Sequence, residues 1–527
     1  MNNIKAIHLL FSLVLILGCT SDFDEINTNP RTLTVGILDE NTYRFFFRRG
    51  LYETTDLIRG PKFQLLHSLF GDVYSNYFAT TAANFESDRF VLVGAWIDRG
   101  YNSSYADVLP QVKAMEDLSE EYGLEVENAM SKVWRVYSFH RLTDYWGPIP
   151  YLNFGNGELS VPFDSQETIY KDFFSTLDEA VAVFKANAGT TSTVLDDVND
   201  VMYGGDVDKW YTFANTLRLR LAIRVKYVDP DLARTEAEKA VADGVMESND
   251  QSAFVTTTPT WANPYNRISQ WGEFRMSADM ESFLKGYRDP RVERYFQEAA
   301  IPDATDDPIG FSFNYEGMRN GQTKSDKQGT DFNSLASNMG PEFNLRGDRG
   351  PNWAVLKATE AYFLRAEGAL EGWNMGGTSE SLYEAGISAS LSEWGTDGND
   401  LEGNDYISST NVPAAIDAST PPVSTVPVAY NVGGTKEEQL EQIITQKWLA
   451  IFPDGKESWA ERRRTGYPTL YDRLGSDNIN IPASSIPRRL PYGTGSYETN
   501  TKAVNEAVAT FLEGKDNGTV KLWWDAK

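Results

Sequence analysis

Aromatic and amide side chains alternate along TWANPYNRISQWGEFR, residues 260–275. A flat aromatic ring covers the C–H face of a sugar, while neighbouring amide or guanidinium groups form hydrogen bonds with its hydroxyls. Trp261, Tyr265, Arg267 and Trp271 are therefore candidate ligand-binding residues. Packing in the core is the alternative role for each ring, because large aromatic side chains also fill protein interiors. The segment predicts a surface of the kind that binds carbohydrate.

A second aromatic stretch lies earlier in the chain, in FGDVYSNYFATTAANF (70–85) and FVLVGAWIDRGYNSSY (90–105). Tyr77, Trp96 and Asn102 combine aromatic rings with an amide there, which is the same mixture as in the first segment. These three residues are further candidates for ligand contact, and core packing is again the alternative for the two rings.

Residue types that serve catalysis are sparse in this chain. It has three histidines, of which His67 and His140 fall on apolar helical stripes, a pattern that predicts hydrogen-bonded core positions. No GxSxG, HExxH, P-loop or GxGxxG motif occurs. The acidic loops 196–200 and 302–308 lack the ligand order of an EF-hand, so calcium is compatible with them but not predicted. We expect no catalytic residue, no metal ligand and no cofactor, although the two opposed carboxylates of a glycosidase would leave no sequence motif.

Charge and cysteine content exclude further classes of protein. The net charge of −27 over 527 residues disfavours a phosphate backbone as partner, so we expect no binding to nucleic acid. Cys19 is the one cysteine, which excludes disulfides and thiolate metal sites from the rest of the chain.

Cys19 directly follows an apolar run, residues 6–18, with Lys5 before it. Such a run forms about 20 Å of helix, too short for a bilayer core of about 30 Å, and is typical of a secretory signal. Gly18 and Cys19 resemble the lipobox of bacterial lipoproteins. This resemblance implies a signal peptide over 1–18, cleavage before Cys19, and a lipid anchor of palmitate-type acyl chains on its sulfur. The acids that follow, at 22, 24 and 25, resemble the export signal of Bacteroidetes surface lipoproteins, which implies an outer-membrane location facing the cell exterior.

The elements that must position the candidate residues are mainly helical. Apolar residues recur at helical spacing in a series of segments. These segments are 125–142, 164–184, 208–227, 231–246, 353–373, 379–394, 437–452 and 457–466. The arginines of 208–227 fall outside its apolar stripe, so we expect them to be solvated or ion-paired. A unit of helix, short turn and helix that spans about 34 residues is typical of tetratricopeptide repeats. An irregular helical domain is the alternative interpretation.

Two long interruptions have a different composition. Residues 247–350 and 395–434 are rich in Asn, Gly, Ser and Pro, and PPVSTVPVAYNVGG in the second has alternating, strand-like valines. We expect a helical repeat frame (about 109–246, 353–394 and 437–466) and loop-rich inserted regions with short strands. Loops on a rigid scaffold usually carry binding residues, so the inserted regions are the expected place of the site.

Several strings of the chain, taken together, resemble one family. They are FDEINTNP (23–30), DYWGPIPY (144–151), YRDPRVERYF (287–296), LKATEAYFLRAEGALEGW (356–373), QKWLAIFPDGKESWAERRRTGYPTL (446–470) and IPRRLPYGTGSYETN (486–500). With the lipoprotein start, this set is similar to the SusD/RagB family of nutrient-binding outer-membrane lipoproteins, in its SusD-like subgroup. The resemblance spans residues 19–527, essentially the whole mature chain.

The strings themselves predict structural roles. Gly147-Pro148 favours a turn that leaves Tyr145 and Trp146 in the core. Arg463 is expected to form a salt bridge or to bond neighbouring carbonyls, and Arg488 and Arg489 are expected to bond carboxylates.

The resemblance implies a mostly α-helical fold with four tetratricopeptide-like helix pairs and a variable, loop-rich half. It implies a non-catalytic protein that captures a glycan and delivers it to a SusC-like TonB-dependent barrel. The region of Trp96 and Asn102 is similar to the stretch from which starch-binding relatives draw an aromatic and an asparagine. Alternatives are the same role with peptides as cargo, a surface glycoside hydrolase, or a purely structural or adhesive surface protein.

Overall fold

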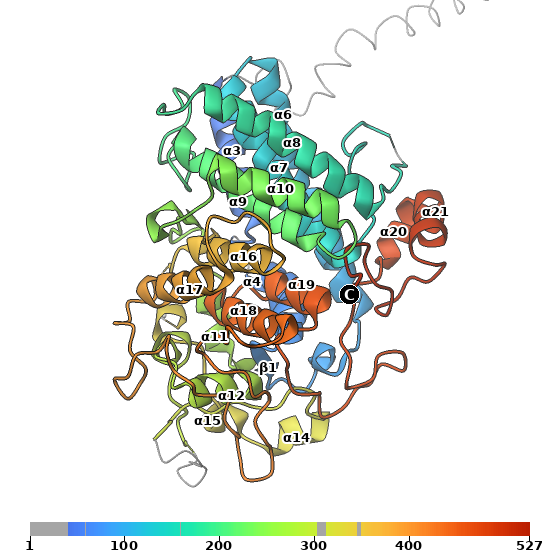
Figure 1. The fold of residues 1–527 in the computed structure, drawn as a ribbon. Coiled ribbons are helices and arrows are strands. Elements are labelled where there is room, and N and C mark those ends of the chain that lie inside the picture. The colour runs from blue at the N-terminus through green and yellow to red at the C-terminus, as the bar shows by residue number, and fades with distance from the viewer. Residues whose placement is uncertain (1–39, 58–59, 159, 303–311, 345–348) are drawn as a thin grey trace, which may run out of the picture.

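A computed structural model describes residues 40–57, 60–158, 160–302, 312–344 and 349–527. The predicted signal peptide 1–18 and Cys19 lie outside these residues. The prediction of a mainly helical fold is confirmed, since helices make up most of the ordered elements and the strands are short (Figure 1). Within the described part of the chain, no helix is both long enough and apolar enough to cross a membrane.

The upper layer of the molecule in Figure 1 is built from antiparallel helices that pack in chain order. Its members are α3 (Glu40–Thr54), α6 (Leu109–Glu121), α7 (Glu125–Trp146), α8 (Gln166–Ala186), α9 (Val207–Arg224) and α10 (Pro230–Asp243). Short polar side chains begin several of them: Ser165 accepts a hydrogen bond from Thr168 N, and Asp206 accepts one from Lys209 N. Gly147 ends α7 at φ +82°, a conformation that favours glycine.

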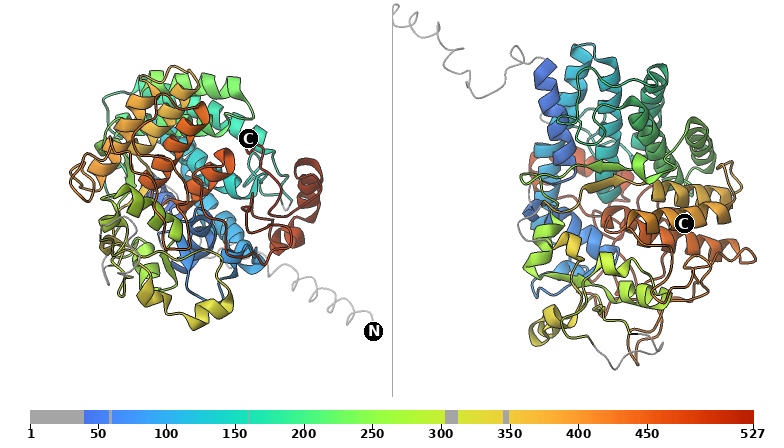
Figure 2. Two further views of the ribbon diagram at one scale, coloured as in Figure 1. Left: turned by 60° about the horizontal axis from the view of Figure 1, so that its bottom comes forward. Right: turned by 90° about the vertical axis from the view of Figure 1, so that its left-hand side faces the viewer.

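The middle layer contains the second half of the helical repeat frame. It consists of α16 (Ala358–Leu370), α17 (Ser379–Glu393), α18 (Lys436–Ala450) and α19 (Gly455–Thr465). Helix α16 packs against α17 and α18, and also against α9 of the upper layer, so it joins the two layers. The right-hand view of Figure 2 shows the same order of layers from the side.

The predicted helix 353–373 is wrong at its start. Trp353–Leu356 forms strand β4, which pairs antiparallel with β2 (Ala253–Val255), and the helix begins only at Ala358. Four apolar residues in a row fit a strand as well as a helix turn, and here pairing with β2 decides between them.

The lower part of the molecule contains short elements from 247–350. They are α11 (Tyr265–Trp271), β3 (Phe274–Met276), α12 (Ala278–Tyr287), α13 (Val292–Tyr295), α14 (Lys324–Gly329), α15 (Phe332–Leu335) and η6 (Pro341–Phe343). From the same region, η5 (Asn249–Gln251) packs higher up, against α9 and α16. Strand β3 pairs antiparallel with β1 (Phe78–Thr80), which places 247–350 against the early part of the chain. That early part also holds α4 (Gly60–Phe63), η2 (Gln64–Asp72), η3 (Glu86–Arg89), α5 (Gly94–Ser103) and η4 (Ser104–Val108).

The inserted region 395–434, all of it described, contains no helix or strand. The strand expected from its valines is therefore wrong. Val426 and Val428 are nevertheless buried, and their carbonyl oxygens accept hydrogen bonds from Tyr287 and Tyr383. The alternation of valines therefore indicates which side chains point inward. Their backbone carbonyls bond tyrosine hydroxyls in place of a neighbouring strand. Two short helices, α20 (Thr494–Thr499) and α21 (Thr501–Phe511), follow near the C terminus.

The family strings for which structural roles were predicted have such roles, while FDEINTNP (23–30) lies outside the described residues. Tyr145 and Trp146 are buried, and the Arg463 guanidinium donates to the carbonyl oxygens of Asp144 and Arg488 at 2.7 and 2.9 Å. Arg488 pairs with Asp525, and Arg489 pairs with Asp516 at 2.5 Å, which confirms their expected carboxylate partners.

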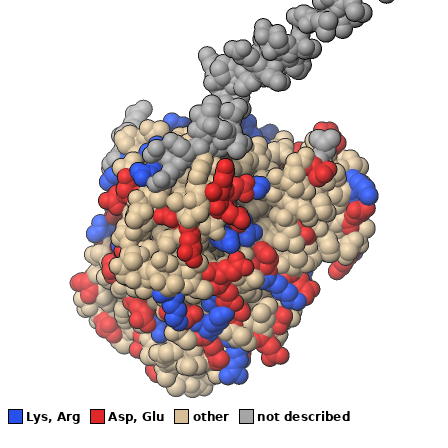
Figure 3. Space-filling model, turned by 90° about the horizontal axis from the view of Figure 1, so that it is seen from above, with Lys and Arg blue, Asp and Glu red and all other residues tan. Residues whose placement is uncertain are grey.

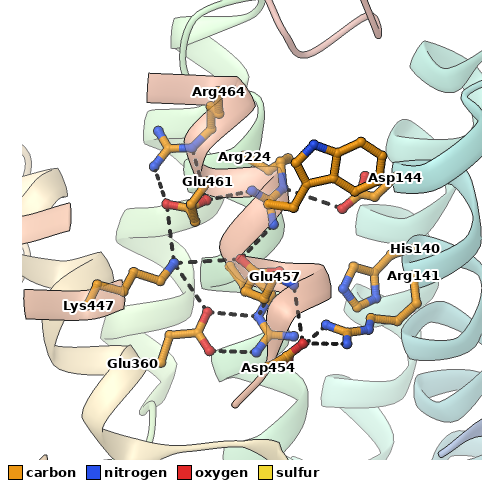
Figure 4. Close-up of polar contacts among 12 residues, drawn as sticks. His140, Arg141, Asp144, Arg224, Glu360, Lys447, Asp454, Glu457, Glu461 and Arg464 are labelled. Atoms are coloured by element: carbon orange, nitrogen blue, oxygen red, sulfur yellow. Dashed lines mark hydrogen bonds and ion pairs between the residues drawn. The ribbon is translucent and has the colours of Figure 1, made fainter. Parts of the chain in front are cut away.

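A buried network of ion pairs connects the two helical layers (Figure 4). From α9, Arg220 binds Glu360 of α16 through two hydrogen bonds, and Arg224 binds Glu457 and Glu461 of α19. Further members, from α7, α16, α18 and the two ends of α19, are Arg141, Asp144, Glu367, Lys447, Asp454 and Arg464. The arginines of α9 were expected to be either solvated or ion-paired. They are ion-paired and buried. Buried charges require such partners, because an unpaired charge in the interior is costly.

Charge on the surface is mixed in sign. On the face in Figure 3, acidic side chains form several groups with basic ones between them. Acidic side chains therefore do not form one continuous patch on this face.

Candidate functional site

Two predicted ligand contacts are core residues instead. Tyr77 is fully buried, stacks on Trp448 with ring centroids 5.3 Å apart, and donates its hydroxyl to the Trp448 carbonyl. Tyr265 is also buried, and its hydroxyl donates to Asp72 Oδ2 and to the Pro453 carbonyl, both at 2.9 Å. Neither ring is accessible to a ligand, so the prediction for Tyr77 and Tyr265 is wrong and the core-packing alternative applies.

The outward side of α11 carries the remaining polar and aromatic candidates. Arg267, Gln270 and Trp271 are exposed, and they share one side of the helix at positions i, i+3 and i+4. Trp271 is 40% exposed, an unusual state for an indole ring. The buried side of the same helix is fixed by Tyr265 and Ile268. A ring, a guanidinium and an amide are therefore presented together to solvent.

The second candidate pair lies on α5. Trp96 is half-buried and packs edge-on against Phe85, with ring centroids 6.0 Å apart. Asn102 is exposed two turns later on the same helix. Helix α20 lies beside this helix, because Gly495 N donates to Asp98 Oδ1 at 3.2 Å. Both candidates of α5 are accessible at least in part.

The structure connects α5 and α11 through a short series of contacts. Phe85 packs against both Trp96 and Phe274, with centroid separations of 6.0 and 5.6 Å. Phe274 begins β3, three residues after Trp271, and β3 pairs with β1. Both α5 and α11 also contact α4. We call the accessible candidates of these two helices, namely the half-buried Trp96 and the exposed Asn102, Arg267, Gln270 and Trp271, the α5–α11 surface.

The remaining aromatic candidate, Trp261, is outside this series of contacts. It is half-buried and stacks face to face on Tyr52 of α3, with centroids 4.4 Å apart and an interplanar angle of 8°. This stack occupies one face of the indole, so only the rest of the ring is available to another group.

Sequence reasoning missed two polar groups that join these segments. Gln64 donates from Nε2 to Glu273 Oε2 at 2.7 Å, across 209 positions of sequence. Burial raises the pKa of Glu273, and the hydrogen bond from Gln64 acts in the opposite direction. No local pattern signals this pair, because it exists only once β1 and β3 have come together.

The two histidines of the described residues are poorly placed for acid–base chemistry. His67 and His140 are both buried, as predicted, and burial lowers the pKa of His67 to about 3. Among the described residues, no group of three or more His, Cys, Asp or Glu side chains is placed to hold a metal ion. The chemistry that the α5–α11 surface offers is stacking and hydrogen bonding.

Comparison with known proteins identifies the relatives of this fold. The family model described as "SusD and RagB outer membrane lipoprotein" matches residues 25–525. A comparison with curated protein sequences gave no match.

Solved structures of SusD homologues are similar over almost the whole chain. A chitin-binding SusD homologue from Flavobacterium johnsoniae is 37% identical, with a TM-score of 0.83, covering 92% of this chain and 98% of its own. A SusD homologue from Bacteroides ovatus is 31% identical, with a TM-score of 0.79 and coverage of 92% and 99%. One from Bacteroides thetaiotaomicron is 30% identical, with a TM-score of 0.79 and coverage of 93% and 99%. On the family match and these identities, the chain belongs to the SusD and RagB family of outer-membrane lipoproteins.

Proposed function

We propose that this protein is a cell-surface lipoprotein that captures a glycan on the α5–α11 surface and delivers it to a SusC-like TonB-dependent transporter. Cys19 anchors it to the outer membrane, facing the exterior, and no cofactor or catalytic residue takes part. The observation that carries the proposal is the exposure of Trp271 beside Arg267 and Gln270 on one side of α11. That combination suits a sugar ring and its hydroxyls, because the indole can stack on the ring while the guanidinium and the amide form hydrogen bonds.

The chitin-binding relative supports a glycan as cargo, because its chain is 37% identical and covers nearly the same residues. Chitin and its oligosaccharides are therefore the first ligands to test. Ring stacking contributes about 0.5–1.5 kcal/mol per contact beyond buried area, so a few contacts give roughly millimolar to micromolar binding. Affinity in that range holds cargo and still permits its release to a transporter.

The direct test is binding of the purified full-length protein to chitin, cellulose and starch, together with a mixed peptide digest. Retention on at least one polysaccharide, with none of the peptides bound, is the expected result. Preferential binding of peptides would replace glycan by peptide as cargo. New reducing ends during the incubation would instead establish a glycoside hydrolase.

The partner is tested separately, by purification of the protein from outer membranes in mild detergent. We expect a TonB-dependent barrel to co-purify with it. Recovery of the protein without any barrel would favour a structural or adhesive role and would contradict the transport step. The orientation is tested by labelling intact cells with a membrane-impermeant reagent. A protein that is wholly protected from the label would contradict the outward orientation.

A further inference from the structure

A cavity of about 310 Å³ lies behind α11, between β4 and the turn that joins α18 to α19. Its aromatic lining consists of Phe254, Phe343, Trp353, Trp394 and Phe452. Its volume is at the lower end of the range of small-molecule sites.

The cavity is separate from the α5–α11 surface. Tyr265, on the buried side of α11, packs against Trp353 and Phe343, with centroids 5.9 Å away in both cases. Arg267 and Trp271 are on the outward side of that helix. Helix α11 therefore separates the two places, and a ligand of one does not contact the other.

Polar side chains complete the lining, and one donor among them has no partner. Arg220 is 2% exposed and binds Glu360 through Nε and Nη2 at 2.9 and 2.5 Å. Its Nη1 is buried without a hydrogen-bond partner among the described residues, although Arg220 lines the cavity. An unsatisfied buried donor costs free energy, about 1–3 kcal/mol, which an acceptor supplied by a ligand would recover.

A second ion pair lies at the same cavity. Lys357 Nζ is 2.7 Å from Glu393 Oε1, and it lies 5.3 Å from the ring centroid of Trp394. Both charged residues and Trp394 line the cavity. Glu393 and Trp394 are half-buried, so they lie toward the outside, whereas Arg220 and Phe452 are buried. Charged groups therefore lie beside aromatic rings both at the buried end of the cavity and at its outer end.

The charges of the lining restrict the ligand. The lining contains the carboxylates of Glu342, Glu360, Glu393 and Asp454 and the cations of Arg220 and Lys357. Each of these four carboxylates has a cationic partner, in the same order Arg294, Arg220, Lys357 and Arg141. The two cations of the lining are thus already neutralised, which disfavours an anion. The unpaired donor on Arg220 requires an acceptor, which an aliphatic cation does not supply. A hydroxyl meets both conditions, since it accepts from a guanidinium and donates to a carboxylate.

We propose that this cavity binds a single neutral pyranose, as a second carbohydrate site distinct from the α5–α11 surface. The ring lies against the aromatic side chains, a hydroxyl accepts from Arg220 Nη1, and others donate to the carboxylates of the lining. This site does not depend on the proposed function of the outward surface, because none of its residues belongs to that surface.

The experiment is calorimetric titration of the purified full-length protein with D-glucose, D-galactose and N-acetyl-D-glucosamine, and with D-glucuronate and L-lysine as charged probes. Saturable binding of at least one neutral sugar is expected, with glucuronate and lysine each at least about tenfold weaker. Failure of all three sugars to bind overturns the proposal. Tighter binding of either charged probe overturns the neutral assignment.

Two variants locate the binding. Ala354 is half-buried and lines the cavity, so Ala354→Phe fills part of it and should weaken sugar binding about tenfold or more. Phe511→Ala is the matched control and should leave this binding unchanged, because Phe511 lies on α21 and belongs to neither place. Trp271→Ala removes the ring of the outward surface and tests that place. The reverse pattern, with binding lost in W271A and kept in A354F, assigns the sugar to the outward surface and overturns the proposal. If A354F does not fold by circular dichroism, Trp394→Ala at the half-buried end carries the same test with the same readout.

Discussion

Arg224 Nη2 donates a hydrogen bond to Glu457 Oε1 over 2.6 Å, although the two residues are 233 positions apart. The contact joins the last turn of α9 to the first turn of α19, and the network around it includes Lys447 of α18 (Figure 4). Each of these charges is buried, so each is held in place by the others.

Replacing Glu457 by Gln should destabilise the protein strongly. The substitution keeps the size of the side chain but removes the charge that faces Arg220, Arg224 and Lys447. Breaking a buried ion network in this way costs about 3–5 kcal/mol. Urea denaturation, followed by circular dichroism, measures the change in the free energy of unfolding.

Glu167→Gln is the matched control for that prediction. Glu167 pairs with Lys171 one turn later on α8, where both side chains are about half exposed. Exposed pairs of this kind contribute little to stability because solvent screens them, so we expect a small change. Equal effects of the two substitutions would contradict the importance given to the buried network.

Trp271→Ala should weaken glycan binding about tenfold, since loss of one stacking ring removes about 1–1.5 kcal/mol of binding free energy. Phe511→Ala is the control, because Phe511 of α21 is likewise 40% exposed and aromatic. Retention on polysaccharide in affinity electrophoresis measures both variants. Equal weakening by both would show that exposed aromatic area, irrespective of its place, accounts for binding.

Tyr77→Phe should reduce stability and leave glycan binding intact. The substitution removes the hydrogen bond to the Trp448 carbonyl but keeps the ring that stacks on Trp448. A cost of about 1–3 kcal/mol is expected, because the buried carbonyl loses its side-chain donor. Denaturation and polysaccharide retention are measured on the same sample, and a binding defect at unchanged stability would return Tyr77 to the ligand site.

Asp72→Asn should become relatively more stabilising as pH rises. Burial raises the pKa of Asp72 to about 7, against the opposing effect of the Tyr265 hydrogen bond. Because the folded pKa exceeds the unfolded value of 3.8, the folded state binds the proton more tightly, and stability falls as pH rises from about 4 to 7. Asn does not titrate, so the variant should gain about 3 kcal/mol relative to the wild type between pH 5 and 8. A constant difference in unfolding free energy across this range would contradict the raised pKa.

The helices of the frame could be predicted because their apolar stripes are long and their caps are local. Helix α3 was missed although Tyr43, Phe47 and Leu51 form a fully buried stripe at i, i+4 and i+8. Phe45 and Phe46 interrupt that stripe, so the apolar residues cover more than one face in sequence. The start of 353–373 was mistaken for helix because pairing with β2 lies outside any local window.

The candidate site was half predictable for a related reason. Residue type indicates that a ring can stack on a sugar, but it does not indicate whether the ring is exposed. Tyr265 and Trp271 stand six positions apart in one short helix, and only tertiary packing places the first in the core and the second in solvent. Tyr77 is buried by Trp448, a partner 371 residues away.

Helix α11 is tied down from beneath, since the Tyr265 hydroxyl binds both Asp72 and the backbone of Pro453. The helix that carries the exposed indole of Trp271 is consequently held in position before any ligand binds. For the glycan contact proposed at Trp271, little backbone entropy would be lost on binding, because hydrogen bonds within the protein already hold the helix that carries the indole. A polymer that binds weakly at each ring would then be held by few contacts.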